Sequence, residues 1–377
     1  MKEEIEYKLE QIANIWNHFI WEYDYCKKEI KFDLEVKTNY FGEILGYFQD
    51  TNNIIFNYSD SGKHSKRFSN QISLLQSIYV QQDFIEELLR LFKLKQNKGD
   101  LKKDPNYSIN RDIRNELVGH PIRRENGNGA LISSCLFGYN GGIDKITYLK
   151  YHRENNFRFE SVEFAIPEII SRHKQFLIFY FDKILNKLKR ILSKFTNEIE
   201  NLEKLIEKKS FNEILKISNV FFESIFKSDY IYDKESLLKI YTKREEHKRY
   251  QNLIDQFYKD LKSGLKETKK YVFELSQPRK EFNAVEIERP IFNIQFVNTS
   301  ELNPEDIEKS VSYHYELGKL ATKRDSRDFV FFGGCLRQKC LDNQLVLDEL
   351  NHMESNIHDK IEYYTAYRLI CKELIND

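Results

Sequence analysis

The amino-acid sequence predicts a mainly α protein that carries a small antiparallel β insertion. Its 377 residues include only 14 glycines and 6 prolines, too few for a fold built from many short strands and turns. Apolar residues also recur at helical spacing over long stretches, whereas one glycine-rich stretch has the alternation of β-strands. With 41% hydrophobic residues, the chain has enough apolar surface for a packed core.

The length of the chain favours two domains. We place a helical bundle at 1–210, with a β-meander at about 130–164 inside it, and a mostly helical region of unassigned role at 211–377. The first helix is expected over 4–25. The next helix is expected over 72–92, because its apolar residues lie three, four or seven positions apart and so form one stripe.

The meander is predicted from the glycines and from alternating residues. Six of the 14 glycines fall within 24 positions, from Gly119 to Gly142. The runs 131–137 and 143–151 are rich in β-forming residues and are separated by Gly-Tyr-Asn-Gly-Gly, which is a hairpin signal. The run 157–164 alternates well enough to form a third strand.

The rest of the chain has helical periodicity. A strong apolar stripe follows Pro167 and continues to Ile206, which predicts a long helix that a break near Thr196 could divide. Further helical patterns lie at 211–226, 235–273 and 346–364. The stretch 277–304 mixes β-branched residues with prolines and is open to two interpretations, one or two strands or a linker.

Charge, cysteines and hydropathy exclude several classes of protein. Lys plus Arg equals Asp plus Glu at 59 each, so a nucleic-acid partner would need a local basic patch. The five scattered cysteines lack the paired spacing of a zinc site and are expected to be reduced core thiols. The charged N-terminus and the longest apolar run, 176–181, indicate neither a leader nor a membrane span, so we expect a cytoplasmic protein that does not contact a membrane.

The most specific string in the chain runs from Arg111 to Pro121. It is predicted to be a helix that stops at His120, because Gly119 suits a helix C-cap and Pro121 disfavours the α conformation of the residue before it. Arg114 and His120 are six apart, so a regular helix would not put them on one face, whereas unwinding at Gly119 would. An arginine beside a histidine, with an amide between them, is suited to work on a phosphodiester.

The segment Arg114-Asn115-x4-His120 resembles the R-x4-6-H motif of the HEPN superfamily, named for its higher eukaryotes and prokaryotes nucleotide-binding domain. The asparagine directly after the arginine is common in the ribonuclease members of that superfamily. The preceding helix, with Gln76 and Tyr79, and the helix that begins at Pro167 resemble the bundle that carries the motif. The resemblance covers about residues 1 to 210, and the meander would be an insertion.

The resemblance implies a metal-independent RNA endonuclease of toxin or phage-defence type, with no cofactor and no metal. His120 would be the general acid or base, Arg114 would hold the phosphate, and Asn115 would orient one of its oxygens. The reaction uses the ribose 2′-hydroxyl as nucleophile. The chain has no second motif of this kind, so a composite site would come from a homodimer. Such proteins have RNA as their partner and, in addition, an antitoxin or a regulatory partner.

Basic residues around the motif are candidates for substrate binding. They are Lys102, Lys103, Arg111, Arg123 and Arg124. The stretch 172–209 has ten basic against five acidic residues, so it forms either an RNA path or a solvated helix face. The stretch 341–377 has eight acids against three bases and is not expected to contact RNA.

Two alternative functions remain open at this level. The bundle could bind a nucleotide or RNA without cleaving it, or it could be a helical dimerisation module in which Arg114 and His120 only stabilise a turn. Outside the motif, His152 and His173 could reach the same cleft, although single histidines on partly apolar elements are more often structural. The string Phe332-Gly333-Gly334-Cys335 lacks the third glycine of a dinucleotide-binding loop.

Overall fold

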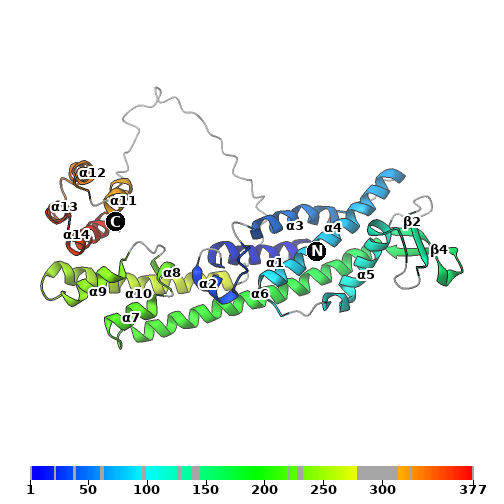
Figure 1. Cartoon of the computed structure of the whole chain (residues 1–377), viewed down its shortest axis with the longest axis horizontal. Helices are drawn as coiled ribbons and strands as arrows, with labels where there is room; N and C mark the ends of the chain where they lie inside the picture. Colours follow the sequence, from blue (N-terminus) through cyan, green and yellow to red (C-terminus); the bar gives the residue numbers. More distant parts are fainter. Residues whose placement is uncertain are drawn as a thin grey trace, which may run out of the picture. The chain divides into compact units, whose positions relative to one another are not determined.

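The computed structural model describes residues 2–20, 23–36, 40–59, 63–95, 99–124, 129–136, 144–219, 221–226, 232–277, 313–322 and 325–375. In these residues, fourteen α-helices and a four-stranded antiparallel sheet confirm the predicted fold class (Figure 1). None of the helices there is long and apolar enough to cross a bilayer. The predicted stretch 277–304 lies, from residue 278 on, outside the described residues, as does the loop 137–143 with its predicted hairpin signal.

The chain divides into two compact units, and the division falls inside a helix. The first unit extends to Thr196 and includes the end of another helix from Val272, whereas the second comprises Asn197–Tyr271 and the described residues after 312. The predicted boundary at 210 follows this division by 14 residues. The helix itself, α6 (Ile166–Leu205), is continuous, so the break considered near Thr196 does not occur.

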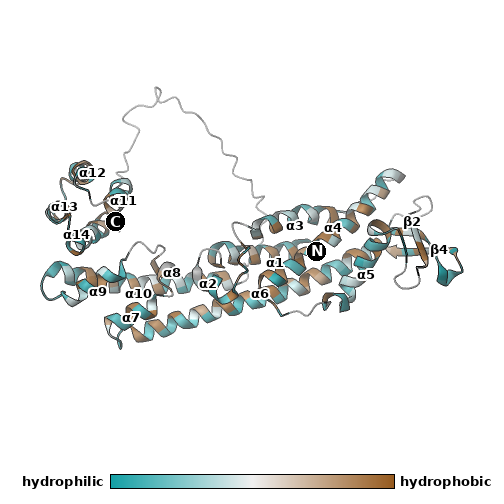
Figure 2. Cartoon of the chain, in the orientation of Figure 1, coloured by the Kyte–Doolittle hydropathy of each residue, from teal (hydrophilic) through white to brown (hydrophobic). Residues whose placement is uncertain are grey.

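Six helices belong wholly or mainly to the first unit. They are α1 (Lys2–Ile15), α2 (Asp24–Ile30), α3 (Tyr40–Phe56), α4 (His64–Leu91), α5 (Pro105–Arg114) and α6. The helix expected over 4–25 is divided, because a π turn at Trp16–Ile20 follows α1 and buries three of its large side chains. The helix expected over 72–92 begins earlier, at His64. Figure 2 shows hydrophobic and hydrophilic residues alternating along α6, as its apolar stripe predicts.

The sheet is a simple meander of β1 (Ile122–Arg124), β2 (Leu131–Leu136), β3 (Lys145–His152) and β4 (Arg158–Ala165). The last three strands were predicted from their composition and alternation. The first was not, because Ile-Arg-Arg is too short and too charged to indicate a strand. It forms because the chain pairs with β2, with Ile122 opposite Ser133 and Arg124 opposite Leu131.

One hydrophobic cluster joins the sheet to the helices of the first unit. It buries residues of α3, α4, α5, the following π turn, β3 and α6, namely Ile55, Leu74, Leu75, Ile78, Ile113, Leu117, Ile146, Tyr148, Ile166 and Ile169. Ile113 and Leu117 come from the predicted motif string itself. The inward face of that string is therefore core.

The second unit contains α7 (Phe211–Ser218), α8 (Phe222–Phe226), α9 (Lys234–Thr242), most of α10 (Lys248–Ser276), α11 (His314–Thr322), α12 (Ser326–Lys339), α13 (Gln344–Ser355) and α14 (Lys360–Ile375). Each of the three helical patterns predicted for this unit corresponds to two helices in the structure. The pattern 346–364 divides because Asp359 caps a new helix, accepting hydrogen bonds from the backbone N–H groups of Ile361 and Glu362 at 2.8 and 3.1 Å. The string 332–335 lies inside α12.

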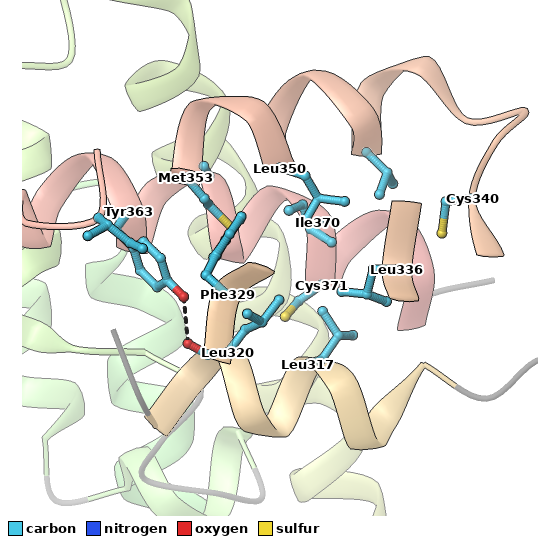
Figure 3. Close-up of a cluster of buried hydrophobic side chains, with 13 residues drawn as sticks. Leu317, Leu320, Phe329, Leu336, Cys340, Leu350, Met353, Tyr363, Ile370 and Cys371 are labelled. Atoms are coloured by element: carbon cyan, nitrogen blue, oxygen red, sulfur yellow. Dashed lines mark hydrogen bonds between the residues drawn. The ribbon is translucent and has the colours of Figure 1, made fainter. Parts of the chain in front are cut away.

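The last four helices share a core of their own. Figure 3 shows Leu317, Leu336, Leu350 and Met353 packed together, each at most 2% exposed. The hydroxyl of Tyr363 donates a hydrogen bond of 2.9 Å to the backbone carbonyl of Leu320, drawn as a dashed line in Figure 3.

All five cysteines are free thiols, and four of them are buried or half-buried. Burial raises the pKa of the Cys26 thiol well above its ordinary value, so this side chain is an inert part of the core. Cys135 differs from the expectation of core thiols. It lies on β2 with its side chain exposed, because β2 turns alternate residues to solvent.

Candidate functional site

The motif string forms a helix that ends in a π turn. Asp104 caps the start of α5, because its Oδ1 accepts a hydrogen bond of 2.9 Å from the backbone N–H of Asn106, and Pro105 occupies the first helical position. After Arg114 the backbone opens into a π turn, Asn115–Gly119. The backbone N–H of His120 closes this turn by donating to the carbonyl of Asn115 at 2.7 Å.

The π turn brings the predicted residues together. A regular helix has 3.6 residues per turn, so residues six apart lie on different faces. A π turn holds one more residue and places His120 over Asn115, five positions earlier. His120 itself leaves the helical conformation, with φ −141° and ψ 62°, since the following proline disfavours the α region at this position. Arg114, Asn115 and His120 all line the same open groove.

The guanidinium of Arg114 is held in place by neutral partners. Its Nε and Nη2 both donate to Oε1 of Gln76 on α4 at 3.1 Å, and its Nη1 donates to Oδ1 of Asn115 at 3.2 Å. Its Cζ lies 3.8 Å from the centre of the Tyr79 ring. Within the part of the chain that the structure describes, no carboxylate forms an ion pair with Arg114. Its positive charge therefore remains available to an anion in the groove.

Tyr79 lies against two guanidinium groups. Besides Arg114, Cζ of Arg111 lies 4.0 Å from the centre of its ring, so both cations contact the aromatic side chain. Arg111 also forms an ion pair of 2.7 Å with Asp83. Arg111 thus lines the groove with its charge already paired. Tyr79 and Gln76 were identified in the sequence only as part of the preceding helix, and their spacing of three, one helical turn, places both beside Arg114.

Gly119 has a different role from the one predicted. The C-cap residue is His120, and Gly119 has no positive φ that would require glycine. A Cβ at position 119 would instead lie 2.7 Å from Nη1 of Arg114 and 3.6 Å from Oδ1 of Asn115. The absence of a side chain makes room for the guanidinium against the turn.

Glu116 joins the π turn to the sheet. Glu116 stands four residues before His120, but its carboxylate contacts residues of β1, β2 and β3. It accepts hydrogen bonds from Tyr148 at 2.8 Å and Ser134 at 3.3 Å, and it forms ion pairs with Lys150 at 3.0 Å and Arg123 at 3.2 Å.

Burial alone would raise the pKa of Glu116. The hydrogen bonds from Lys150 and Tyr148 and the charge of Lys150 outweigh burial and lower the pKa, so the carboxylate stays ionised.

The sheet also contacts the chain after His120, because the backbone N–H of Ser134 donates to the carbonyl of Pro121 at 2.7 Å. The meander therefore holds the chain on both sides of His120.

The five predicted substrate-binding residues separate into two sets. Lys102 and Arg111 line the groove with Arg114. The other three, whose side chains have partners of their own, do not. Lys103 pairs with Asp100 at 2.8 Å, Arg123 pairs with Glu116, and Arg124 donates to the carbonyl of Gly129 at 3.0 Å.

The groove is electropositive although the whole chain is neutral. It has a volume of about 1120 Å³ and is open to solvent. Its lining includes the six basic residues Arg90, Lys93, Lys95, Lys102, Arg111 and Arg114, against the two acids Glu86 and Asp112. Three of the six are partly neutralised, because Arg90 and Lys93 share Asp33 and Arg111 pairs with Asp83. Arg90, Lys93 and Lys95 were not among the predicted site residues, although three basic residues within six positions at the end of the 72–92 helix could have indicated them.

The other two histidines near the meander are structural. His173 is fully buried and hydrogen-bonded to Gln81 at 2.8 Å, and burial lowers its pKa to about 3. His152 is 9% exposed and lies 3.1 Å from Glu160 on the neighbouring strand. Neither residue lines the groove, so His120 is the one histidine in its described lining.

The described residues contain no group of three or more His, Cys, Asp or Glu side chains arranged to hold a metal ion. Comparison with known protein families, with curated proteins and with solved structures finds no match to this chain. The geometry and charge of the groove are therefore the observations on which a function is proposed.

Proposed function

We propose that the chain is a metal-independent RNA endonuclease of toxin or phage-defence type, acting in the cytoplasm. One observation carries this proposal. Arg114, Asn115 and His120 line a single open groove whose basic residues outnumber its acids by six to two, in a chain with no net charge. A polyanion is the ligand that such a groove selects.

The chemistry follows from the three side chains. The His120 imidazole takes the proton of a ribose 2′-hydroxyl, or returns a proton to the leaving 5′-oxygen. The 2′-oxygen attacks the adjacent phosphorus, the bond to the 5′-oxygen breaks, and the products carry a 2′,3′-cyclic phosphate and a 5′-hydroxyl. Arg114 holds the non-bridging oxygens and stabilises the charge that grows on them. His120 is exposed, so an RNA strand can reach it.

Asn115 has a defined orientation in this scheme. Its Oδ1 accepts the hydrogen bond from Nη1 of Arg114, which leaves the NH₂ group as the donor of its side chain. An NH₂ group beside a guanidinium can donate to a second oxygen of the same phosphate. Arg114 and Asn115 would thus bind two oxygens and orient the phosphorus toward His120.

The proposed active form is a homodimer. Cleavage by 2′-hydroxyl attack needs both a base and an acid, and the chain has a single motif. A second copy related by two-fold symmetry would supply the second histidine and arginine. The unit formed by Asn197–Tyr271 and the described residues after 312 would then serve regulation, by sensing a signal or by binding an antitoxin.

The test is cleavage without metal. Labelled tRNA and mRNA are incubated with the purified protein in EDTA, beside the His120→Ala and Arg114→Ala variants. Cleavage by the wild type that leaves 2′,3′-cyclic phosphate ends, and that both variants lose, supports the proposal. Arg124→Ala is the control. Arg124 is exposed and donates a hydrogen bond to the carbonyl of Gly129 outside the groove, so this variant should cleave RNA as the wild type does.

The alternatives give different results in the same assay. RNA that is bound but never cleaved would indicate a non-catalytic RNA-binding module. The absence of both binding and cleavage, with a stable dimer in solution, would indicate a dimerisation module in which Arg114 and His120 stabilise a turn. Growth arrest on expression, relieved by His120→Ala, would support the toxin-type activity in cells.

A further inference from the structure

A second, smaller groove continues from the first. It has a volume of about 430 Å³ and is lined by Lys93, Leu94, Lys95, Lys183, Asn186, Lys187 and Arg190. The residues 93–95 line both grooves, so the two form one depression. Five of the seven residues in the second groove are Lys or Arg, and none is acidic.

The basic residues from α6 lie on one face of the helix. Lys183, Lys187 and Arg190 are spaced four and three apart, which places them in a row along the groove. Lys183 is further held over the ring of Phe179, with Nζ 4.3 Å from the ring centre. A row of this kind repeats positive charge along a line, as a nucleic-acid backbone repeats negative charge.

The cations of this row differ from three others on the same helix, each of which forms an ion pair. Arg172 pairs with Glu168, Lys174 with Glu4 at 3.0 Å, and Lys194 with Glu29 at 2.7 Å. By contrast, no ion pair to Lys183, Lys187 or Arg190 is formed within the described ranges. A chain with as many acids as bases could have paired them. Their unpaired charge, gathered in a groove, points to an anionic ligand that supplies the missing partners.

We propose that the two grooves form one track for single-stranded RNA. The first groove holds the phosphate to be cleaved, and the second binds phosphates of nucleotides farther along the same strand. This inference rests on the proposed function and assigns it a substrate class. A single strand can bend from the end of α4 onto the face of α6, whereas a duplex is stiff. A strand is also free to place its 2′-hydroxyl in line with the bond that breaks.

The experiment measures binding rather than cleavage. Fluorescence anisotropy compares labelled oligouridylates of about 4 and about 16 nucleotides, bound to the His120→Ala protein so that the strands stay intact. The test variant adds Lys187→Gln and Arg190→Gln. The matched control adds Lys174→Gln and Lys194→Gln, which remove the same charge from the same helix at paired positions.

We expect the longer strand to bind about tenfold tighter than the shorter one, and the test variant to lose most of that advantage. The slope of log K against log salt for the longer strand should fall by about 1.4, or about 0.7 for each lost phosphate contact. The control variant should bind both strands as the His120→Ala protein does. The shorter strand, which reaches only the first groove, should be unaffected by any of these changes.

Several outcomes would overturn the inference. They are equal losses for both strand lengths, an equal loss in the control, no binding of either strand, or an oligoglutamate that competes as well as RNA does. Cleavage is measured separately, with the wild-type protein. Cleavage with no length dependence would keep the proposed function and reject the track, whereas length-dependent binding without any cleavage would keep the track and reject the nuclease.

Discussion

The guanidinium of Arg114 lies where a side chain at position 119 would be, and Gly119 has no side chain. A Cβ on Gly119 would lie 2.7 Å from Nη1 of Arg114, closer than non-bonded atoms approach. The opposing atom is the far end of a flexible side chain rather than backbone. A methyl group at position 119 would therefore displace the guanidinium and leave the π turn intact. The pair links the local backbone directly to the candidate chemistry.

Gly119→Ala should abolish most activity while the protein stays folded. The displaced guanidinium would lose its bonds to Gln76 and Asn115, and we expect cleavage to fall by about 10- to 100-fold, equivalent to about 1.4–2.8 kcal/mol. The melting temperature should change by only a few degrees. Gly46→Ala is the control, because a Cβ there meets nothing within 4 Å. An unchanged rate in Gly119→Ala would show that the position of Arg114 is unimportant.

Tyr79→Leu should weaken the site through both arginines. The ring contacts the guanidinium groups of Arg111 and Arg114, and each cation–π contact contributes about 0.5–1 kcal/mol at a partly exposed position. Removing both predicts a loss of about 5- to 30-fold in RNA binding. Tyr79→Phe keeps the aromatic face and should bind normally. Equal losses in the two variants would instead implicate the tyrosine hydroxyl.

Lys102 and Lys103 provide a matched pair of neighbours. Lys102 lines the groove, whereas Lys103 pairs with Asp100 at 2.8 Å and does not. Lys102→Gln should weaken RNA binding several-fold and lower the salt slope by about 0.7. Lys103→Gln should leave both unchanged. Titrations at several salt concentrations measure both quantities, and a larger effect at Lys103 would contradict the placement of the groove.

Glu116→Gln should destabilise the first unit in a pH-dependent way. Its carboxylate accepts bonds from Lys150 and Tyr148, and hydrogen bonds to a charged group contribute about 1.5–3 kcal/mol. Its folded-state pKa is lowered, so this stability is present above the unfolded pKa and is lost as the pH falls through the folded pKa. Urea unfolding should show the largest difference from the wild type near pH 7 and a smaller one in acid. A difference that is constant with pH would exclude the ionised carboxylate as the cause.

His173 predicts a second dependence on pH, of separate origin. Burial lowers its pKa to about 3, so the folded protein keeps it neutral while the unfolded chain binds a proton near pH 6.5. The stability from the neutral form is complete above pH 6.5 and is lost as the pH falls toward 3, by about 1.4 kcal/mol per pH unit. His173→Gln retains a donor for Gln81 without titrating. Urea unfolding at pH 7 and pH 5 should show a flatter profile for this variant than for the wild type.

Much of the fold could be predicted because helical periodicity is a local signal. The stripe after Pro167 identified α6, the β-forming residues of 143–151 identified β3, and the alternation in 157–164 identified β4. The boundaries between helices were harder to predict from the sequence. Asp359 starts a new helix inside a stripe that reads as continuous, because the apolar spacing is preserved across a turn.

The residue types of the candidate site and a departure from the regular helix near Gly119 were predictable. Arg114, Asn115 and His120 stand out in the sequence, but no spacing rule indicates the π turn over Asn115–Gly119 that places them along one groove. Nor could the local sequence show that Arg123 would find a carboxylate while Lys187 and Arg190 would not. Arg123 on β1 pairs with Glu116 of the π turn, so tertiary packing decides that pairing.

The sequence by itself determined that this is a mainly α chain with a β-meander after a helix that ends at His120, because propensity, periodicity and the proline are local properties. The tertiary structure decided where the charge lies. It placed α4, α5 and α6 so that cations from four separate segments line one depression, while many others are paired with acids. The net charge of zero does not indicate this arrangement, because the electrostatic potential depends on the distances between charges, and the fold sets those distances.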